Sequence, residues 1–209
     1  MARPSSAARA VPVLALCLSA AGSLEAVDPA AGRLLVASRK VSDPAFAGTV
    51  VLLIRHDSRG AMGLILNRQS EIPLSKLFPG LPSPANASDP VFLGGPVGRT
   101  GVIGLVRSSV APAGAGLVFS DVLMIVNREP LSQTIAAGAR PDKFRAYLGY
   151  SGWTTGRLPA EVEAGSWHVL PATTRLVFDP DPPTLWPRLM RRIESLSAGR
   201  PAATRRSGA

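Results

Sequence analysis

Cysteine is almost absent from this sequence, since Cys17 is the only one among 209 residues. A single cysteine excludes a disulfide within the chain and a metal site built on several cysteines. Histidine is nearly as scarce, with only His56 and His168. A metal site without cysteine would need both histidines together with carboxylates. We therefore predict no metal site and no cofactor.

Aromatic residues are also few, at 5% of the chain, whereas hydrophobic residues reach 46%. The core must therefore consist mainly of Val, Leu, Ile and Ala, which suits a domain that contains β-sheet. So few aromatic side chains argue against a surface on which nucleic-acid bases stack. A chain of this length holds one ordinary domain with tails.

The net charge of +9 is concentrated near the C-terminus. Residues 188–209 carry six arginines against Glu194 alone, whereas residues 27–187 are only mildly basic. An arginine-rich helix and tail could contact DNA, and such binding would weaken steeply as salt rises. No helix-turn-helix, zinc-finger or RNP-like pattern accompanies it. A role on DNA would therefore rest on charge alone.

The N-terminal segment is typical of an export signal. Two arginines precede a charge-free stretch at residues 10–24, which matches a signal-peptide core and is too short to span a bilayer comfortably. Small residues allow cleavage after Ala21 or after Ala26. We expect residues 1–26 to be a signal peptide and the protein to be periplasmic or secreted. The alternative is that residues 1–26 are an unstructured N-terminal extension of a cytoplasmic protein.

The hydrophobic pattern over residues 27–197 predicts one α+β domain. Residues 49–54 are apolar and rich in β-branched side chains, which is typical of a strand buried on both faces. A turn then leads into residues 61–67, so we expect a β-hairpin in which Gly60 and Gly63 let the backbone bend. Further strands are expected at residues 34–37, 91–93, 101–106, 117–119, 144–148 and 167–170, and helices at 73–78, 131–137, 158–164 and 183–196.

Small residues, proline and arginine dominate the end of the chain, so residues 198–209 are expected to form a disordered tail. We expect no transmembrane segment after the signal peptide.

Three local patterns resemble functional motifs without matching them fully. The segment around Ser151 is similar to a nucleophile elbow, but Trp153 stands where the second glycine belongs, so a turn is the better interpretation. The glycines that begin with Gly94 and Gly95 lack the Gly-Lys pair of a nucleotide-binding loop. They favour a strand-to-strand turn, with an anion on its backbone amides as the alternative. His56 is expected to be a polar strand-end residue, with general-base chemistry as the alternative.

Four segments, taken in order, resemble the YqgE/AlgH family: VSDPAF at 41–46, GAMGLILNR at 60–68, FLGGPV at 92–97 and LGYSGW at 148–153. The resemblance implies one AlgH-like α+β domain on a mainly antiparallel or mixed β-sheet with flanking helices. It also implies a largely uncharacterised family without agreed catalytic residues, some of whose members are labelled regulators of alginate synthesis and transcription. Arg157 departs from the glutamine usual there, and an export signal is atypical of a family usually taken as cytosolic.

Three kinds of function follow from these patterns. The first is a non-enzymatic binding or regulatory module with an unidentified partner, which would be a protein rather than nucleic acid if the chain is exported. The second is a transcriptional regulator, which would require a cytoplasmic location. The third is an unrecognised enzyme or small-ligand binder whose pocket is lined by His56, Asn67, Gly94, Gly95, Ser151 and Trp153.

Overall fold

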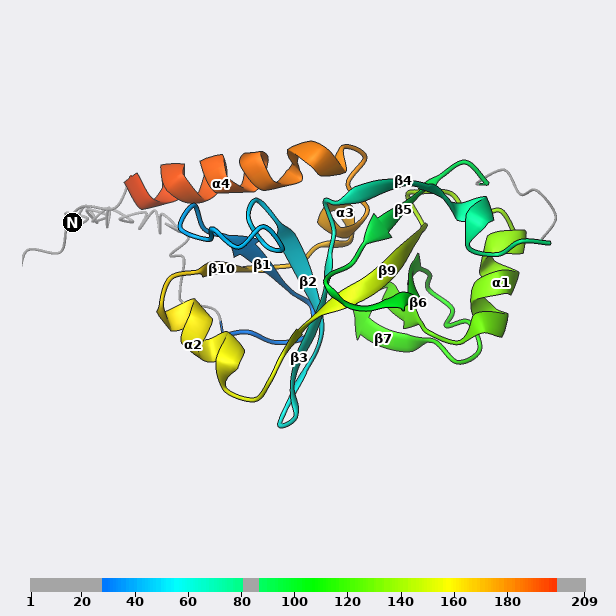
Figure 1. Ribbon diagram of the computed structural model, residues 1–209, viewed down its shortest axis with the longest axis horizontal. Coiled ribbons are helices and arrows are strands. Elements are labelled where there is room, and N and C mark those ends of the chain that lie inside the picture. The colour runs from blue at the N-terminus through cyan, green and yellow to red at the C-terminus, as the bar shows by residue number, and fades with distance from the viewer. Residues whose placement is uncertain (1–27, 81–86, 199–209) are drawn as a thin grey trace, which may run out of the picture.

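The computed structural model describes residues 28–80 and 87–198 (Figure 1). The expected signal peptide, Cys17 and the expected tail beyond residue 198 lie outside the described residues. The strands are β1 (Arg33–Ala37), β2 (Val50–Asp57), β3 (Gly60–Ile65), β4 (Gln69–Pro73), β5 (Pro90–Leu93), β6 (Val97–Arg107), β7 (Gly116–Phe119), β8 (Val122–Ile125), β9 (Phe144–Trp153) and β10 (Trp167–Pro171).

These strands form one curled sheet in the order β10, β1, β2, β3, β9, β6, β8 and β7. Strand β5 joins β9 in parallel and also carries β4, whereas the other pairings are antiparallel. The prediction of an α+β domain on a mainly antiparallel or mixed sheet is confirmed. The helices are η1 (Leu74–Lys76), α1 (Arg128–Ala136), α2 (Arg157–Glu163), α3 (Thr174–Val177) and α4 (Pro182–Ala198).

Strand β1 and the first five residues of β2 are buried on both faces, as their apolar runs predict. Successive side chains of a strand point to opposite faces, so Leu34 and Val36 pack with α4 residues such as Leu185, whereas Leu35 and Ala37 pack on the side of α2. Full burial of each such aliphatic side chain contributes about 1.5–3 kcal/mol. Helices α4 and α2 therefore cover opposite faces of this half of the sheet (Figure 1).

The prediction of a turn at residues 149–153 is wrong, because β9 continues through them to Trp153. Its first half pairs with β6 and its last residues pair with β3, where Ser151 lies opposite Gly63. Gly149 adopts φ +67°, and a Cβ on it would lie 2.7 Å from the Val97 carbonyl oxygen. The glycines let the strand bend so that one strand serves both halves of the sheet.

Other differences from the sequence expectations are local. Strand β6 begins at Val97, ahead of the expected start at residue 101, and the expected helix at 73–78 is the 3₁₀ turn η1. Strands β4 and β8 and helix α3 differ from the expectations; β4 is polar and mostly exposed, and β8 and α3 are four residues each. No helix in the described ranges is long and apolar enough to cross a membrane.

Candidate functional site

A cavity of about 320 Å³ lies where three segments distant in sequence meet. These segments are β4 with β5, the start of β9, and the connection between α3 and α4. A mostly apolar concavity with a few polar groups is the usual form of a small-molecule site. Half of its lining residues are phenylalanines and prolines: Phe92, Phe144, Phe178, Pro90, Pro141, Pro180 and Pro182.

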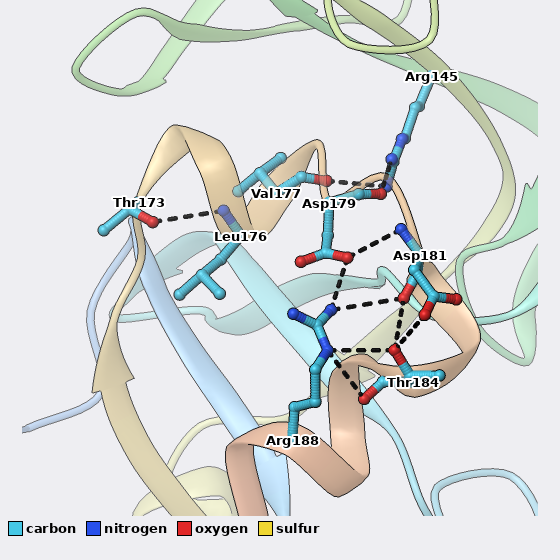
Figure 2. A network of polar contacts seen from close by, with 8 residues as sticks. All are labelled: Arg145, Thr173, Leu176, Val177, Asp179, Asp181, Thr184 and Arg188. Atoms are coloured by element: carbon cyan, nitrogen blue, oxygen red, sulfur yellow. Dashed lines mark hydrogen bonds and ion pairs between the residues drawn. The ribbon is translucent and has the colours of Figure 1, made fainter. Parts of the chain in front are cut away.

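Arg145 lines this cavity and is only 6% exposed. Its Nη1 donates to the carbonyl of Val177 at 3.0 Å, and its Nη2 donates to the carbonyl of Asp179 (Figure 2). A guanidinium has five N–H groups, so these two bonds leave three, and the Nε is buried without a hydrogen-bond partner in the described structure. Arg145 is thus a buried cation whose donors are only partly used.

The charge of Arg145 is not matched by an acidic side chain. No carboxylate of the described residues lies within ion-pair distance of it. The ring of Phe92 lies 4.9 Å and that of Phe178 lies 5.9 Å from the guanidinium carbon, so aromatic faces replace part of the lost hydration. A buried charge without a counter-ion is costly, and an anion in the cavity would supply that counter-ion.

The connection between α3 and α4 is held in place from both sides (Figure 2). Asp179 is buried, and its Oδ1 accepts from Arg188 of α4 at 2.6 Å and from the backbone N–H of Asp181 at 2.9 Å. The hydrogen bond to Asp179 raises the pKa of Arg188. Arg188 also donates to Thr184 at 3.1 Å. This arginine of α4 is therefore part of the fold rather than of a free basic face.

Tyr147 lies two residues beyond Arg145 on β9 and is fully buried. Its hydroxyl has no hydrogen-bond partner in the part of the chain that the structure describes. Burial raises the pKa of Tyr147 to about 12, although the charge of Arg145 opposes the shift. Its ring lies 5.3 Å from that of Phe92. Tyr147 is not among the described residues that line the cavity, but it packs against Phe92, which does line it.

Three further charged residues line the cavity. Arg140 and Asp142 are exposed and bond to each other at 3.1 Å. Asp89 is half-buried, and no hydrogen bond or ion pair of its carboxylate is found within residues 28–80 and 87–198. Burial raises the pKa of Asp89. The cavity therefore has one neutralised pair and two unpaired charges of opposite sign, Arg145 and Asp89.

The structure brings three of the expected site residues together. The Oγ of Ser151 donates to the carbonyl of Gly94 at 3.2 Å, and Gly95 packs against the backbone of Tyr150 and Ser151. Ser151 is fully buried, and the Gly94 N–H donates to Leu148 at 2.8 Å. These groups are used to join β5 to β9, so the hydroxyl is not presented to a substrate and the Gly94 amide is not free for an anion.

Trp153 belongs to a separate aromatic cluster on the α2 side of the sheet. Its ring lies 5.8 Å from Phe46 and 5.9 Å from Trp167. Both indoles donate to Oε2 of Glu161, at 2.9 and 2.8 Å, and Arg157 donates to Oε1 at 2.9 Å. Burial would raise the pKa of Glu161, but these three hydrogen bonds together lower it. Trp153 therefore has a structural role, because it joins strand β9 to helix α2 through Glu161.

Asn67 and His56 lie in other surroundings. Asn67 accepts from the N–H of Val50 at 2.8 Å and donates to the carbonyl of Gly48 at 2.9 Å, so its amide extends the pairing at the start of β2. His56 is exposed near the end of β2, opposite Ala61. None of the six expected site residues is among the described residues that line the 320 Å³ cavity.

A family profile described as AlgH-like (DUF179) matches residues 34–197. The chain belongs to this AlgH-like family. A UPF0301 protein of Methylococcus capsulatus is 36% identical over 164 residues, which cover 77% of this chain and 89% of that protein. A UPF0301 protein of Chlorobium limicola is 34% identical over 161 residues, covering 77% and 84%.

Two solved structures have the same architecture. The solution structure of the AlgH protein from Pseudomonas aeruginosa matches with a TM-score of 0.64 and 31% identity, over 81% of this chain and 93% of that one. The crystal structure of protein DIP2367 from Corynebacterium diphtheriae matches with a TM-score of 0.69 over 86% and 91%, and at 24% identity it shows the fold alone. The resemblance to the YqgE/AlgH family is thus confirmed.

Sequence reasoning missed the charged residues of the cavity in this AlgH-like domain. A local signal existed for Arg145, because it is the one charged residue in the otherwise apolar or neutral strand β9. A cation inside a buried strand needs a partner or a function. Asp89 gave no such signal, since it follows a Pro-rich stretch that is typical of a surface loop.

Proposed function

We propose that this protein is a non-enzymatic binding module that holds a small organic anion in the cavity beside Arg145. The observation that carries the proposal is the burial of this cation without a carboxylate partner among the described residues. A ligand carboxylate would accept charge-assisted hydrogen bonds from N–H groups that the fold leaves unused. The apolar wall of Phe92, Phe144 and Phe178 would cover the rest of the ligand.

The lining supports binding rather than catalysis. Its described residues include no serine, threonine, cysteine, histidine or lysine, and so none of the common nucleophiles other than carboxylates. No group of three or more His, Cys, Asp or Glu side chains in the described ranges is arranged to hold a metal ion. The volume of about 320 Å³ is near the lower end for ligand pockets, which favours a small molecule.

Isothermal titration calorimetry with 3-phenylpropionate and with L-phenylalanine tests the proposal. We expect at least one of these carboxylates to bind the wild-type protein with a 1:1 stoichiometry, and Arg145→Lys to weaken that binding by about tenfold or more, because lysine lacks the planar fork of donors. Arg191→Lys is the matched control, since Arg191 is exposed on α4 and does not line the cavity. Absence of binding by both compounds, or equal loss in both variants, would refute the proposal.

We also propose that the chain is exported, on the basis of the charge-free stretch at residues 10–24. Intact mass and cell fractionation of the natively expressed protein test this. Loss of the residues before Gly22 or Val27 would support export, whereas a full-length cytoplasmic protein would refute it.

A further inference from the structure

The cavity contains a carboxylate as well as a cation. Asp89 precedes β5, and its backbone carbonyl accepts from the N–H of Leu74 at 2.9 Å, which fixes the residue at the cavity wall. Its side chain has no hydrogen bond or ion pair within the described structure, including none with Arg145. Two residues of opposite charge therefore line one cavity without forming an ion pair with each other.

The other charged residues of the cavity leave Arg145 and Asp89 as its two unpaired charges. Arg140 and Asp142 neutralise each other at the exposed rim. Asp179 is committed to Arg188, and Arg145 reaches only its backbone. The described lining thus has equal numbers of positive and negative side chains, with one unpaired charge of each sign. A dianion such as a phosphate monoester would be repelled by Asp89 and attracted by only one unpaired arginine.

The geometry points to a zwitterion with an apolar body: we infer that the ligand is an α-amino acid with a large apolar side chain. This inference rests on the proposed function, because it assigns the ligand carboxylate to Arg145 and adds the ligand ammonium group opposite Asp89. The side chain would then lie against Phe92, Phe144 and Phe178, where an aromatic ring gains from ring-to-ring contact. One amino acid suits a cavity of about 320 Å³.

Calorimetry with three related compounds separates the two charges of the ligand. L-Phenylalanine has both charges, 3-phenylpropionate lacks the ammonium group, and phenethylamine lacks the carboxylate. We expect the wild-type protein to bind L-phenylalanine about tenfold more tightly than 3-phenylpropionate, because the ammonium group gains a charge-assisted bond to Asp89. Phenethylamine should bind more weakly than either carboxylate.

Asp89→Asn should remove the preference for L-phenylalanine and leave the affinity for 3-phenylpropionate within a few-fold of wild type. Glu163→Gln is the matched control, because Glu163 is an exposed carboxylate on α2 that does not line the cavity, and it should keep the preference. Urea denaturation of both variants confirms that each is folded.

The outcomes distinguish the inference from the proposed function. If 3-phenylpropionate binds as tightly as L-phenylalanine, or if Asp89→Asn keeps the preference, the amino-acid assignment is wrong and the anion site stands. If neither carboxylate binds the wild-type protein, both fail. A preference for L-phenylalanine that Asp89→Asn abolishes and Glu163→Gln keeps would support both.

Discussion

Arg145 bonds to the backbone carbonyl of Asp179, while the carboxylate of Asp179 is held by Arg188 at 2.6 Å (Figure 2). One acidic residue therefore links two arginines from different elements, β9 and α4. The arrangement fixes the connection between α3 and α4, and the carboxylate of Asp179 bonds to Arg188 instead of Arg145. The ion pair between Asp179 and Arg188 stabilises this part of the cavity wall. Because it occupies the carboxylate of Asp179, Arg145 has no counter-ion among the described residues.

Arg145→Met should destabilise the protein by about 2 kcal/mol, because the loss of buried donors to the carbonyls of Val177 and Asp179 exceeds the gain from removing an unpaired buried charge. Tyr147→Phe is the matched control on the same strand. Its hydroxyl has no partner in the described structure, so its removal should change the free energy of unfolding by less than about 0.5 kcal/mol, or should stabilise the fold. Urea unfolding measures both, and equal losses would contradict the structural role of Arg145.

Asp89→Asn should make the ligand-free protein more stable at neutral pH. Burial raises the pKa of Asp89 in the folded state above its usual 3.8. The folded state therefore binds this proton more tightly than the unfolded state, so the stabilisation is complete below pH 3.8 and is lost as pH rises through the folded pKa. The stability difference between Asp89→Asn and wild type should grow over this window in urea titrations. A pH-independent difference would show that Asp89 is not desolvated.

Glu161→Gln should destabilise the protein by about 1 kcal/mol at neutral pH, since three hydrogen bonds to a carboxylate become bonds to a neutral amide or are lost. The folded pKa of Glu161 lies below the usual 4.5. Its contribution is thus present above pH 4.5 and is lost as pH falls through the folded pKa. Thermal unfolding should show that Glu161→Gln is less acid-sensitive than wild type. Glu163→Gln, an exposed change on the same helix, should match wild type throughout.

Gly95→Ala should cost about 3 kcal/mol or more. Gly95 has φ +154°, and an added Cβ would overlap the backbone of Tyr150 and Ser151, which cannot move without disrupting β9. Gly116→Ala on the edge strand β7 is the control, because nothing lies within 4 Å of the new Cβ. Chemical denaturation should separate the two variants clearly. Similar stabilities would mean that the junction of β5 with β9 tolerates a side chain.

The sequence predicted those elements whose signal is local. The apolar run of β2 and the turn before β3 specify a buried strand and a hairpin without reference to the rest of the chain. The glycines from Gly149 onward look like a turn for the same local reason. They form a strand only because β3 and β6 supply partners from elsewhere in the chain.

The cavity could not be predicted in the same way. Its lining comes from β4 and β5, the start of β9 and the connection before α4, and a sequence pattern does not show that these segments meet. The glycine-rich motifs suggested a site, but the structure uses Gly94, Gly95 and Ser151 to pack strands closely. Arg145 could be noticed in the sequence because it is a charged residue within an apolar strand. That Asp89 has no partner could not be noticed, because it depends on how the chain folds.

Side-chain NMR of Arg145 tests occupation of the cavity by an anion most directly. The Nε–Hε resonance can be assigned by its absence from the spectrum of Arg145→Lys, and it reports on bonds to the guanidinium. We predict a saturable shift of this resonance with L-phenylalanine or 3-phenylpropionate, and none with phenethylamine, which has no carboxylate. A resonance that stays in place with both carboxylates up to millimolar concentration would contradict the assignment of this cavity as an anion-binding site.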